Sequence, residues 1–161
     1  GKNSNLISKK NGSWITLGFM ILTKDLVPDK PHQSLCGKCD QCIKHCPTEA
    51  IVEPFVIKSD LCIAYHTIES REKTIPKKIE ENLNGWVAGC DICQDICPWN
   101  KSVPYNNIFE TTPKGWIKDI NIDSLNWDNK TWENNLKGTT LTRIKPWMWK
   151  RNIKANLRNK N

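Results

Sequence analysis

The sequence predicts an α+β chain in three parts, and the assignment rests on where the cysteines, tryptophans and basic residues fall. All eight cysteines of the 161-residue chain lie between Cys36 and Cys97. Six of the eight tryptophans lie at or after Trp99, where the cysteines have ended. We therefore expect a strand-and-loop segment, a cysteine-rich module and a helical region, at residues 1–31, 32–104 and 105–161.

The first segment mixes short apolar runs with Gly12, Gly18, Pro28 and Pro31, which favours strand and loop over helix. Its longest apolar run, WITLGFMIL, is too short to span a bilayer. We find no leader peptide, so we expect a cytoplasmic protein that does not enter a membrane. The chain begins GKNSNLI without Met, which reads like the interior of a domain, and we expect a fragment.

Three elements are expected inside the module. The run IVEPFVI at 51–57 has strand character interrupted by Pro54, which predicts an edge or irregular strand. Short helices are expected at 60–70 and 75–84, and Pro76 begins the second of them.

The sequence of the last region predicts a pair of helices at residues 124–138 and 139–159. A single face of the second helix carries most of its apolar residues, and Pro146 is expected to kink that helix. The residues of this apolar face are Leu141, Ile144, Met148, Ile153 and Leu157.

The cysteine spacing is the strongest chemical signal in the chain. The run CGKCDQCIKHCP at 36–47 ends in Cys-x-x-Cys-x-x-x-Cys-Pro, and so does CDICQDICP at 90–98. Such loops wrap three thiolates round a 4Fe-4S cluster, and the cysteine before proline ligates the second cluster of a two-cluster ferredoxin. The second run lacks its first cysteine because Val87 stands there, and Cys62 is the one cysteine left to replace it.

The cysteines then divide into two complete sets of four: Cys36, Cys39, Cys42 and Cys97 in the first, and Cys46, Cys62, Cys90 and Cys93 in the second. Zinc also takes four thiolates, but its sites usually pair two Cys-x-x-Cys knuckles. Disulfides are disfavoured because the chain shows no sign of secretion. We favour two 4Fe-4S clusters, which act in electron relay because protein ligands occupy every corner.

Positive charge gathers at the end of the chain. Residues 1–100 carry 12 basic and 12 acidic residues, whereas residues 101–161 carry 12 basic and 5 acidic ones. From Lys137 onward there are eight basic residues and no acidic one, which favours a polyanion-binding surface.

Several motifs together resemble the epoxyqueuosine reductase family, in the family's order. They are GKNSNLI, GSWITLG, CGKCDQCIKHCPTEAI, CIAYHTIE, GCDICQDICPWNK and the ending RNIKANLRN. GCDICQDICPWNK is the most specific, because generic ferredoxins lack both the displaced cysteine and the Trp-Asn-Lys that follows. The resemblance covers nearly the whole chain.

The resemblance implies an oxidoreductase that reduces epoxyqueuosine to queuosine at the wobble position of tRNA, the last step of queuosine synthesis, with cobalamin and two 4Fe-4S clusters. It implies that residues 1–31 end a truncated α/β cobalamin domain and that the helical tail is HEAT-like and incomplete. No catalytic residue is carried over, because the family's proton donor lies upstream, and this chain alone is expected to be inactive. Asp91, Tyr65 and Ser4 are expected near the corrin edge.

The implied partners are a tRNA with a queuosine-type wobble base and an electron donor such as a ferredoxin or flavodoxin system. The expected tRNA contacts are Arg143, Arg151, Lys145, Lys150, Lys154 and Arg158. Trp147 or Trp149 would stack on an unpaired base, although packing is the commoner role of a tryptophan within a helix.

Two other functions fit parts of the pattern. A free-standing two-cluster electron carrier would need no basic tail. A reductive dehalogenase-like corrinoid enzyme would normally carry an export leader. Tight tRNA binding would separate the first function from both alternatives.

Overall fold

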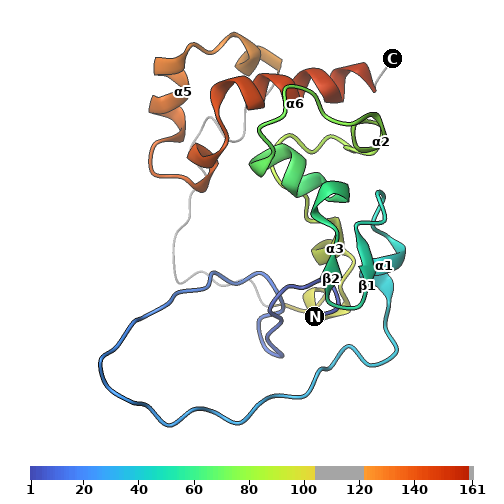
Figure 1. Ribbon diagram of the computed structural model, residues 1–161, viewed down its shortest axis with the longest axis vertical. Helices are drawn as coiled ribbons and strands as arrows, with labels where there is room; N and C mark the ends of the chain where they lie inside the picture. The colour runs from blue at the N-terminus through green and yellow to red at the C-terminus, as the bar shows by residue number, and fades with distance from the viewer. Residues whose placement is uncertain (104–121, 160–161) are drawn as a thin grey trace.

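The computed structural model describes residues 1–103 and 122–159, in which short helices surround one two-stranded sheet (Figure 1). This mixture of helices and a small sheet confirms the α+β prediction. The first helices and strands of the module are α1 (Gln41–Lys44), β1 (Ile51–Glu53), β2 (Val56–Ile57), the 3-10 turn η1 (Ser59–Leu61) and the π-helix η2 (Tyr65–Glu69). After them come α2 (Lys77–Glu80), α3 (Ile92–Asp95) and the 3-10 turn η3 (Pro98–Asn100).

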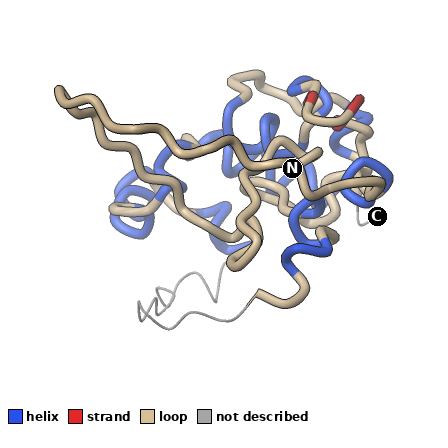
Figure 2. The backbone as a smooth tube through the Cα atoms, turned by 90° about the horizontal axis from the view of Figure 1, so that it is seen from below, coloured by secondary structure: helices blue, strands red, loops and turns tan. Residues whose placement is uncertain are grey.

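The first segment differs from the sequence prediction. Residues 1–31 contain no strand, and their one ladder contact is an isolated bridge between Ser8 and Gly12. From residue 14 to residue 35 the chain runs as a long loop that stands away from the helices (Figures 1 and 2). The strand prediction was wrong here because a strand needs a partner to pair its backbone groups. Large apolar side chains remain exposed along this loop, among them Phe19, Ile21 and Val27.

The run 51–57 forms a hairpin rather than one interrupted strand. β1 and β2 pair antiparallel, with Ile51 opposite Ile57 and Glu53 opposite Val56. Pro54 lies in the turn, where its missing N–H removes no ladder bond. Phe55 completes the turn with φ of 70°, the left-handed region.

The two helices predicted in the module are present in irregular form. The first is split into η1 and η2, and the second is the single turn α2, which follows Pro76 as predicted. Thr67 explains part of the irregularity of η2, because its hydroxyl donates to Ile63 O at 2.9 Å and competes with regular helix bonding.

The helical pair of the tail is present. It comprises the 3-10 turn η4 (Ile122–Asn126), α5 (Asn129–Leu136), the 3-10 turn η5 (Thr140–Arg143) and α6 (Pro146–Arg158). Asp128 caps α5 by accepting from Thr131 N at 2.7 Å. Pro146 does not kink the second helix. It begins α6, because proline fits the first turn of a helix, where its missing N–H would have no partner.

Two apolar cores hold the chain together, and α6 contributes to both. One joins Trp132 and Leu136 of α5 to the predicted apolar face of α6, which includes Met148 and Ile153. In the other, Ala155 of α6 packs with the module residues Ile63, Ile75, Ile79 and Leu83. The tail is therefore packed against the cysteine module, and the predicted boundary at residue 104 lies outside the described residues. No helix in the described part of the chain is long and apolar enough to cross a membrane.

Candidate metal centre

The first set of cysteines surrounds one cavity. Cys36, Cys39, Cys42 and Cys97 line a space of about 230 Å³. Three of them come from the loop and helix at α1, where Cys39 N donates to Cys36 O at 2.9 Å and closes a tight turn. Gly37 makes that turn possible, since its φ of 49° is costly for residues with a Cβ. Cys97 lies immediately before η3.

The second set surrounds another cavity. Cys46, Cys62, Cys90 and Cys93 line it together with apolar side chains, which include Ala50, Ile51, Ile57, Ile63 and Ile92. The helices α1 and α3 pack against each other, so the two cysteine runs are interleaved as the sequence predicts.

All eight cysteines are free thiols, with no disulfide between them. Burial raises the pKa of the Cys93 thiol to about 12 and that of Cys90 to about 11, and the neighbouring cysteines add to both shifts. Burial also raises the pKa of Cys42. Such thiols keep their protons unless a cationic centre replaces them.

The arrangement fits a cluster better than a single ion. Among the described residues, no group of three or more His, Cys, Asp or Glu side chains is gathered tightly enough for one metal ion. A zinc ion needs sulfurs about 2.3 Å away from it. Four thiols around a cavity instead suit an inorganic core that fills the space between them.

The N-terminal residues hold both cysteine runs in place. Lys2 Nζ donates to Gly37 O at 2.8 Å and to Cys39 O at 2.7 Å. The buried Asn3 donates to Cys93 O at 3.1 Å. These bonds give the opening GKN motif a structural role.

The Trp-Asn-Lys motif after Pro98 has a comparable role. Asn100 Nδ2 donates to Ser13 Oγ and to Gln94 O, both at 2.8 Å. Its Oδ1 accepts from Ser13 N at 2.7 Å. Asn100 thereby ties the start of the long loop to α3, a link that the sequence motif alone did not predict.

Arg151 is an interior residue, which corrects its predicted place on the RNA surface. Arg151 is 8% exposed, and its guanidinium donates to His66 O within η2 and to Ser70 O and Glu72 O just after it. Burial lowers the pKa of Arg151. A buried guanidinium held by backbone carbonyls is not available to a phosphate, so we remove Arg151 from the RNA surface.

Two asparagines complete this polar clamp, a term we use for Arg151, Asn152 and Asn156 of α6. Asn152 Nδ2 donates to Thr67 O and to Val87 O, both at 2.8 Å. Asn156 accepts from Gly85 N and donates to Trp86 O, both at 3.0 Å. Sequence reasoning missed the clamp, although asparagines four residues apart on the buried side of a helix were a signal for it.

Two of the other predicted RNA contacts form ion pairs within the protein. Arg143 pairs with Glu69 at 2.6 Å, and Arg158 pairs with Glu80 at 2.6 Å. Lys145 and Lys154 are exposed, and Lys150 is half-buried.

The two tail tryptophans take different positions. Trp149 is buried and donates from Nε1 to Ser124 Oγ at 3.0 Å, so it packs and does not stack on a base. Trp147 is half-buried, with Lys73 Nζ 4.6 Å from its ring centroid.

The three residues predicted at the corrin edge belong to three different segments of the chain. Tyr65 is exposed on η2, and Asp91 precedes α3 beside the second cavity. Ser4 is exposed and donates to Phe55 O at 2.9 Å.

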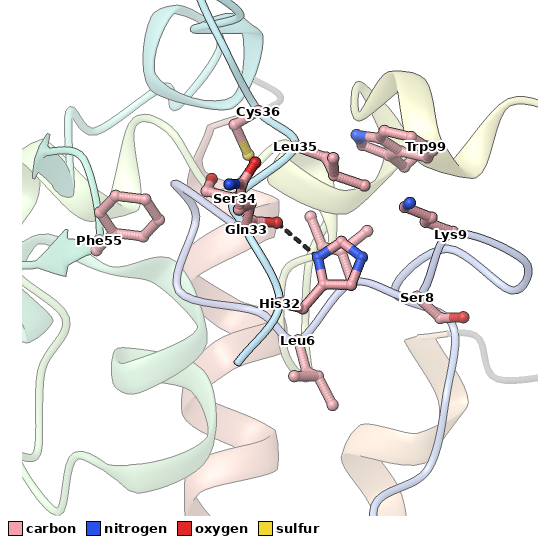
Figure 3. A pocket seen from close by; sticks show the side chains of 12 residues that line it. Leu6, Ser8, Lys9, His32, Gln33, Ser34, Leu35, Cys36, Phe55 and Trp99 are labelled. Carbon is pink, nitrogen blue, oxygen red and sulfur yellow. Dashed lines mark hydrogen bonds between the residues drawn. The ribbon is translucent and has the colours of Figure 1, made fainter. Parts of the chain in front are cut away.

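Phe55 lines an open pocket of about 570 Å³ that also reaches Cys36 of the first set (Figure 3). Ile7, Leu35, Cys36 and Trp99 border both this pocket and the first cavity. A ligand in the pocket would therefore lie next to the first set of cysteines.

Comparison with known proteins defines the class of this chain. Residues 35–100 match a family described as a 4Fe-4S double cluster binding domain. The chain thus carries a ferredoxin-like 4Fe-4S binding domain, and all eight cysteines lie within the matched residues.

The relatives over the full chain are epoxyqueuosine reductases. The chain is 49% identical to the enzyme of Synechococcus sp. (strain CC9605), over 96% of the chain and 49% of the relative. It is 48% identical to that of Prochlorococcus marinus, over 95% of the chain and 50% of the relative. It is 35% identical to that of Vibrio cholerae, over 95% and 42%. The chain is thus a homologue of epoxyqueuosine reductases, as its motifs predicted, and spans about half the length of these relatives.

Solved structures agree with this relationship. Epoxyqueuosine reductase from Bacillus subtilis matches 98% of this chain with a TM-score of 0.87 and 26% identity, over 42% of its own length. An epoxyqueuosine reductase bound to an epoxyqueuosine-modified tRNA-Tyr stem loop matches equally well.

Proposed function

We propose that this chain is the electron-relay and tRNA-binding part of an epoxyqueuosine reductase, which reduces epoxyqueuosine to queuosine at the tRNA wobble position. The observation that carries the proposal is the pair of cavities, each lined by a complete set of four cysteines, in a chain homologous to these enzymes. The rest of the activity requires the half of the relatives that this chain does not span.

Each cysteine set would hold one 4Fe-4S cluster. When bound, such clusters supply electrons singly to a reaction that consumes two. The chain's own part is to hold the thiolates, to keep water from the second set with apolar side chains, and to fix both runs through Lys2 and Asn3. A ferredoxin or flavodoxin system in the cytoplasm would be the electron source.

Cobalamin would lie against the pocket beside Cys36, which Phe55, Leu35 and Trp99 also line. The exposed apolar residues of the 14–35 loop support the assignment of this segment to the end of a cobalamin domain, because the other half of the enzyme would cover them. On this arrangement Ser4, bonded to Phe55, is the best placed of the three proposed corrin-edge residues, ahead of Tyr65 and Asp91.

The tail would form part of a HEAT-like RNA surface. Lys145 and Lys154 are exposed cations of this surface, and Lys150 follows Lys145 along α6. Arg143 and Arg158 would contact RNA only if each gave up its ion pair, with Glu69 and Glu80 respectively, and bound a phosphate instead. Phosphate contacts of this kind position RNA without selecting its sequence.

The proposal is tested in a chimera that joins this chain to the remaining half of the Synechococcus relative. Purified without oxygen and loaded with cobalamin and iron–sulfur clusters, the chimera should convert epoxyqueuosine to queuosine in tRNA, measured by mass spectrometry of the nucleosides. The chain alone should not. A chimera that binds its clusters and the tRNA but leaves the epoxide intact under strong reductant would refute the proposal.

A further inference from the structure

The two four-cysteine cavities differ in the charges around them. Lys2 lines the first cavity, and its ammonium group is fixed there by Gly37 O and Cys39 O, within the turn that carries Cys36 and Cys39. Both acceptors are neutral carbonyls, so they orient the ammonium group without neutralising it. The acid of the same loop, Asp40, pairs with Lys44 at 2.9 Å, and Lys2 is only the smallest of the causes that lower the pKa of Asp40.

The second cavity differs in its charge. Both cavities have largely apolar linings, and at the second one Asp91 follows Cys90 directly in the chain. The Asp91 carboxylate accepts from the neutral amide of Gln94 at 2.7 Å, which leaves its negative charge in place. Two neutral groups act the other way, since Ala50 N donates to Cys46 Sγ at 3.2 Å and Thr48 Oγ1 lies 3.7 Å from the same sulfur. Neutral dipoles are a weaker influence than a full charge.

These differences affect how readily each cluster accepts an electron. Reduction adds one negative charge to a group that already carries the charges of four thiolates. A fixed cation favours the reduced form, whereas a carboxylate disfavours it. Both charges act in the same direction when the two cavities are compared.

Given the two clusters of the proposed function, we infer that the cluster of Cys36, Cys39, Cys42 and Cys97 has the higher reduction potential. Lys2 raises this potential, and Asp91 lowers that of the other cluster. One electron from a low-potential protein donor therefore passes from the second cluster to the first, with no bond or proton exchanged. Since the open pocket borders Cys36, the electron arrives on the side where an acceptor can bind.

The test is a mediated redox titration of the cluster-loaded chain, followed by the electron paramagnetic resonance of the reduced clusters. The parent should show two waves. Lys2→Gln keeps a hydrogen-bonding group but removes the charge, and should lower the upper wave alone. At the parent's upper midpoint, the ratio of reduced to oxidised cluster should fall about tenfold. This corresponds to a decrease of about 59 mV in the reduction potential of a one-electron couple.

Three variants serve as controls. Lys2→Arg retains the charge and should keep the upper wave near its parent position. Lys38→Gln removes an exposed charge from the same loop, and water should screen its effect to less than half that of Lys2→Gln. Asp91→Asn should raise the lower wave and leave the upper one in place.

Coincident waves in the parent would overturn the inference. A Lys2→Gln variant that shifts the lower wave, or that shifts neither wave, would also overturn it. If Lys2→Gln lost iron, the parent titration and Asp91→Asn would still decide the order of potentials. Iron content separates this inference from the proposed function. A parent chain that does not bind two clusters contradicts the proposed function, whereas two clusters of equal potential contradict only the inference about their order.

Discussion

Removing Asn152 should destabilise the protein far more than removing a similar asparagine from a helix surface. Asn152 is fully buried, and its amide donates to Thr67 O and Val87 O while its Oδ1 accepts from Arg151 Nε at 3.0 Å. Asn152→Ala therefore leaves one buried carbonyl, one partly buried carbonyl and one buried guanidinium N–H without this partner. Each such group costs about 1–3 kcal/mol, and partial relaxation brings the expected total to about 3–5 kcal/mol.

The matched control is Asn134→Ala, at an exposed position of α5. Both variants gain the same helix propensity of alanine, so the difference between them isolates the buried bonds. A loss of about 4 kcal/mol with a urea dependence of about 2 kcal/mol per molar lowers the unfolding midpoint by about 2 M. The control should shift by about 0.5 kcal/mol or less.

The assay is urea unfolding of the cluster-loaded chain without oxygen, followed by circular dichroism and by the visible absorption of the clusters. Asn152 joins η2, which follows Cys62, to the loop that precedes Cys90. Asn152→Ala should therefore also release iron first from the second set. Equal midpoints for the two alanine variants would refute the reasoning, because the clamp would then contribute nothing to stability.

Three further outcomes are expected. Cys62→Ala should leave about half the iron, because only the second set loses a ligand, and Cys36→Ala should leave the iron of the second set. If metal analysis finds the full iron content in Cys62→Ala, the assignment of cysteines to the two sets is wrong. Replacing both Lys145 and Lys154 with Gln should make the slope of log tRNA affinity against log salt shallower by about 1.4, from two lost phosphate contacts, and an unchanged slope would mean that RNA binds elsewhere. Arg158 lowers the pKa of Glu80, so this pair stabilises the fold above the unfolded pKa of about 4.3, and the stabilisation is lost as pH falls through the lower folded value. Glu80→Gln should remove this part of the pH dependence, by about 1 kcal/mol or less, in unfolding midpoints measured from pH 3 to pH 7; an identical pH profile would count against the pair.

The sequence by itself predicts a division of the cysteines into two sets of ligands. Cluster ligands must converge on one small core, so their spacing is a local constraint that shows in the chain, and even the displaced Cys62 follows by elimination. The structure places the same two sets around two cavities. The apolar face of α6 and the role of Pro76 were also predictable, because helix periodicity and helix starts are local features.

Only the tertiary structure decided which polar residues are interior. A basic residue in a helix rich in basic residues reads as a surface cation. Arg151 is buried because carbonyls of η2 and of the residues after it need donors, which lie 79 to 85 positions away in sequence. The same holds for Pro146, whose effect depends on whether a helix precedes it, and for residues 1–31, whose apolar run forms no strand without a partner. Local spacing fixes which atoms can share a ligand, whereas burial and pairing depend on segments that meet only in the folded chain.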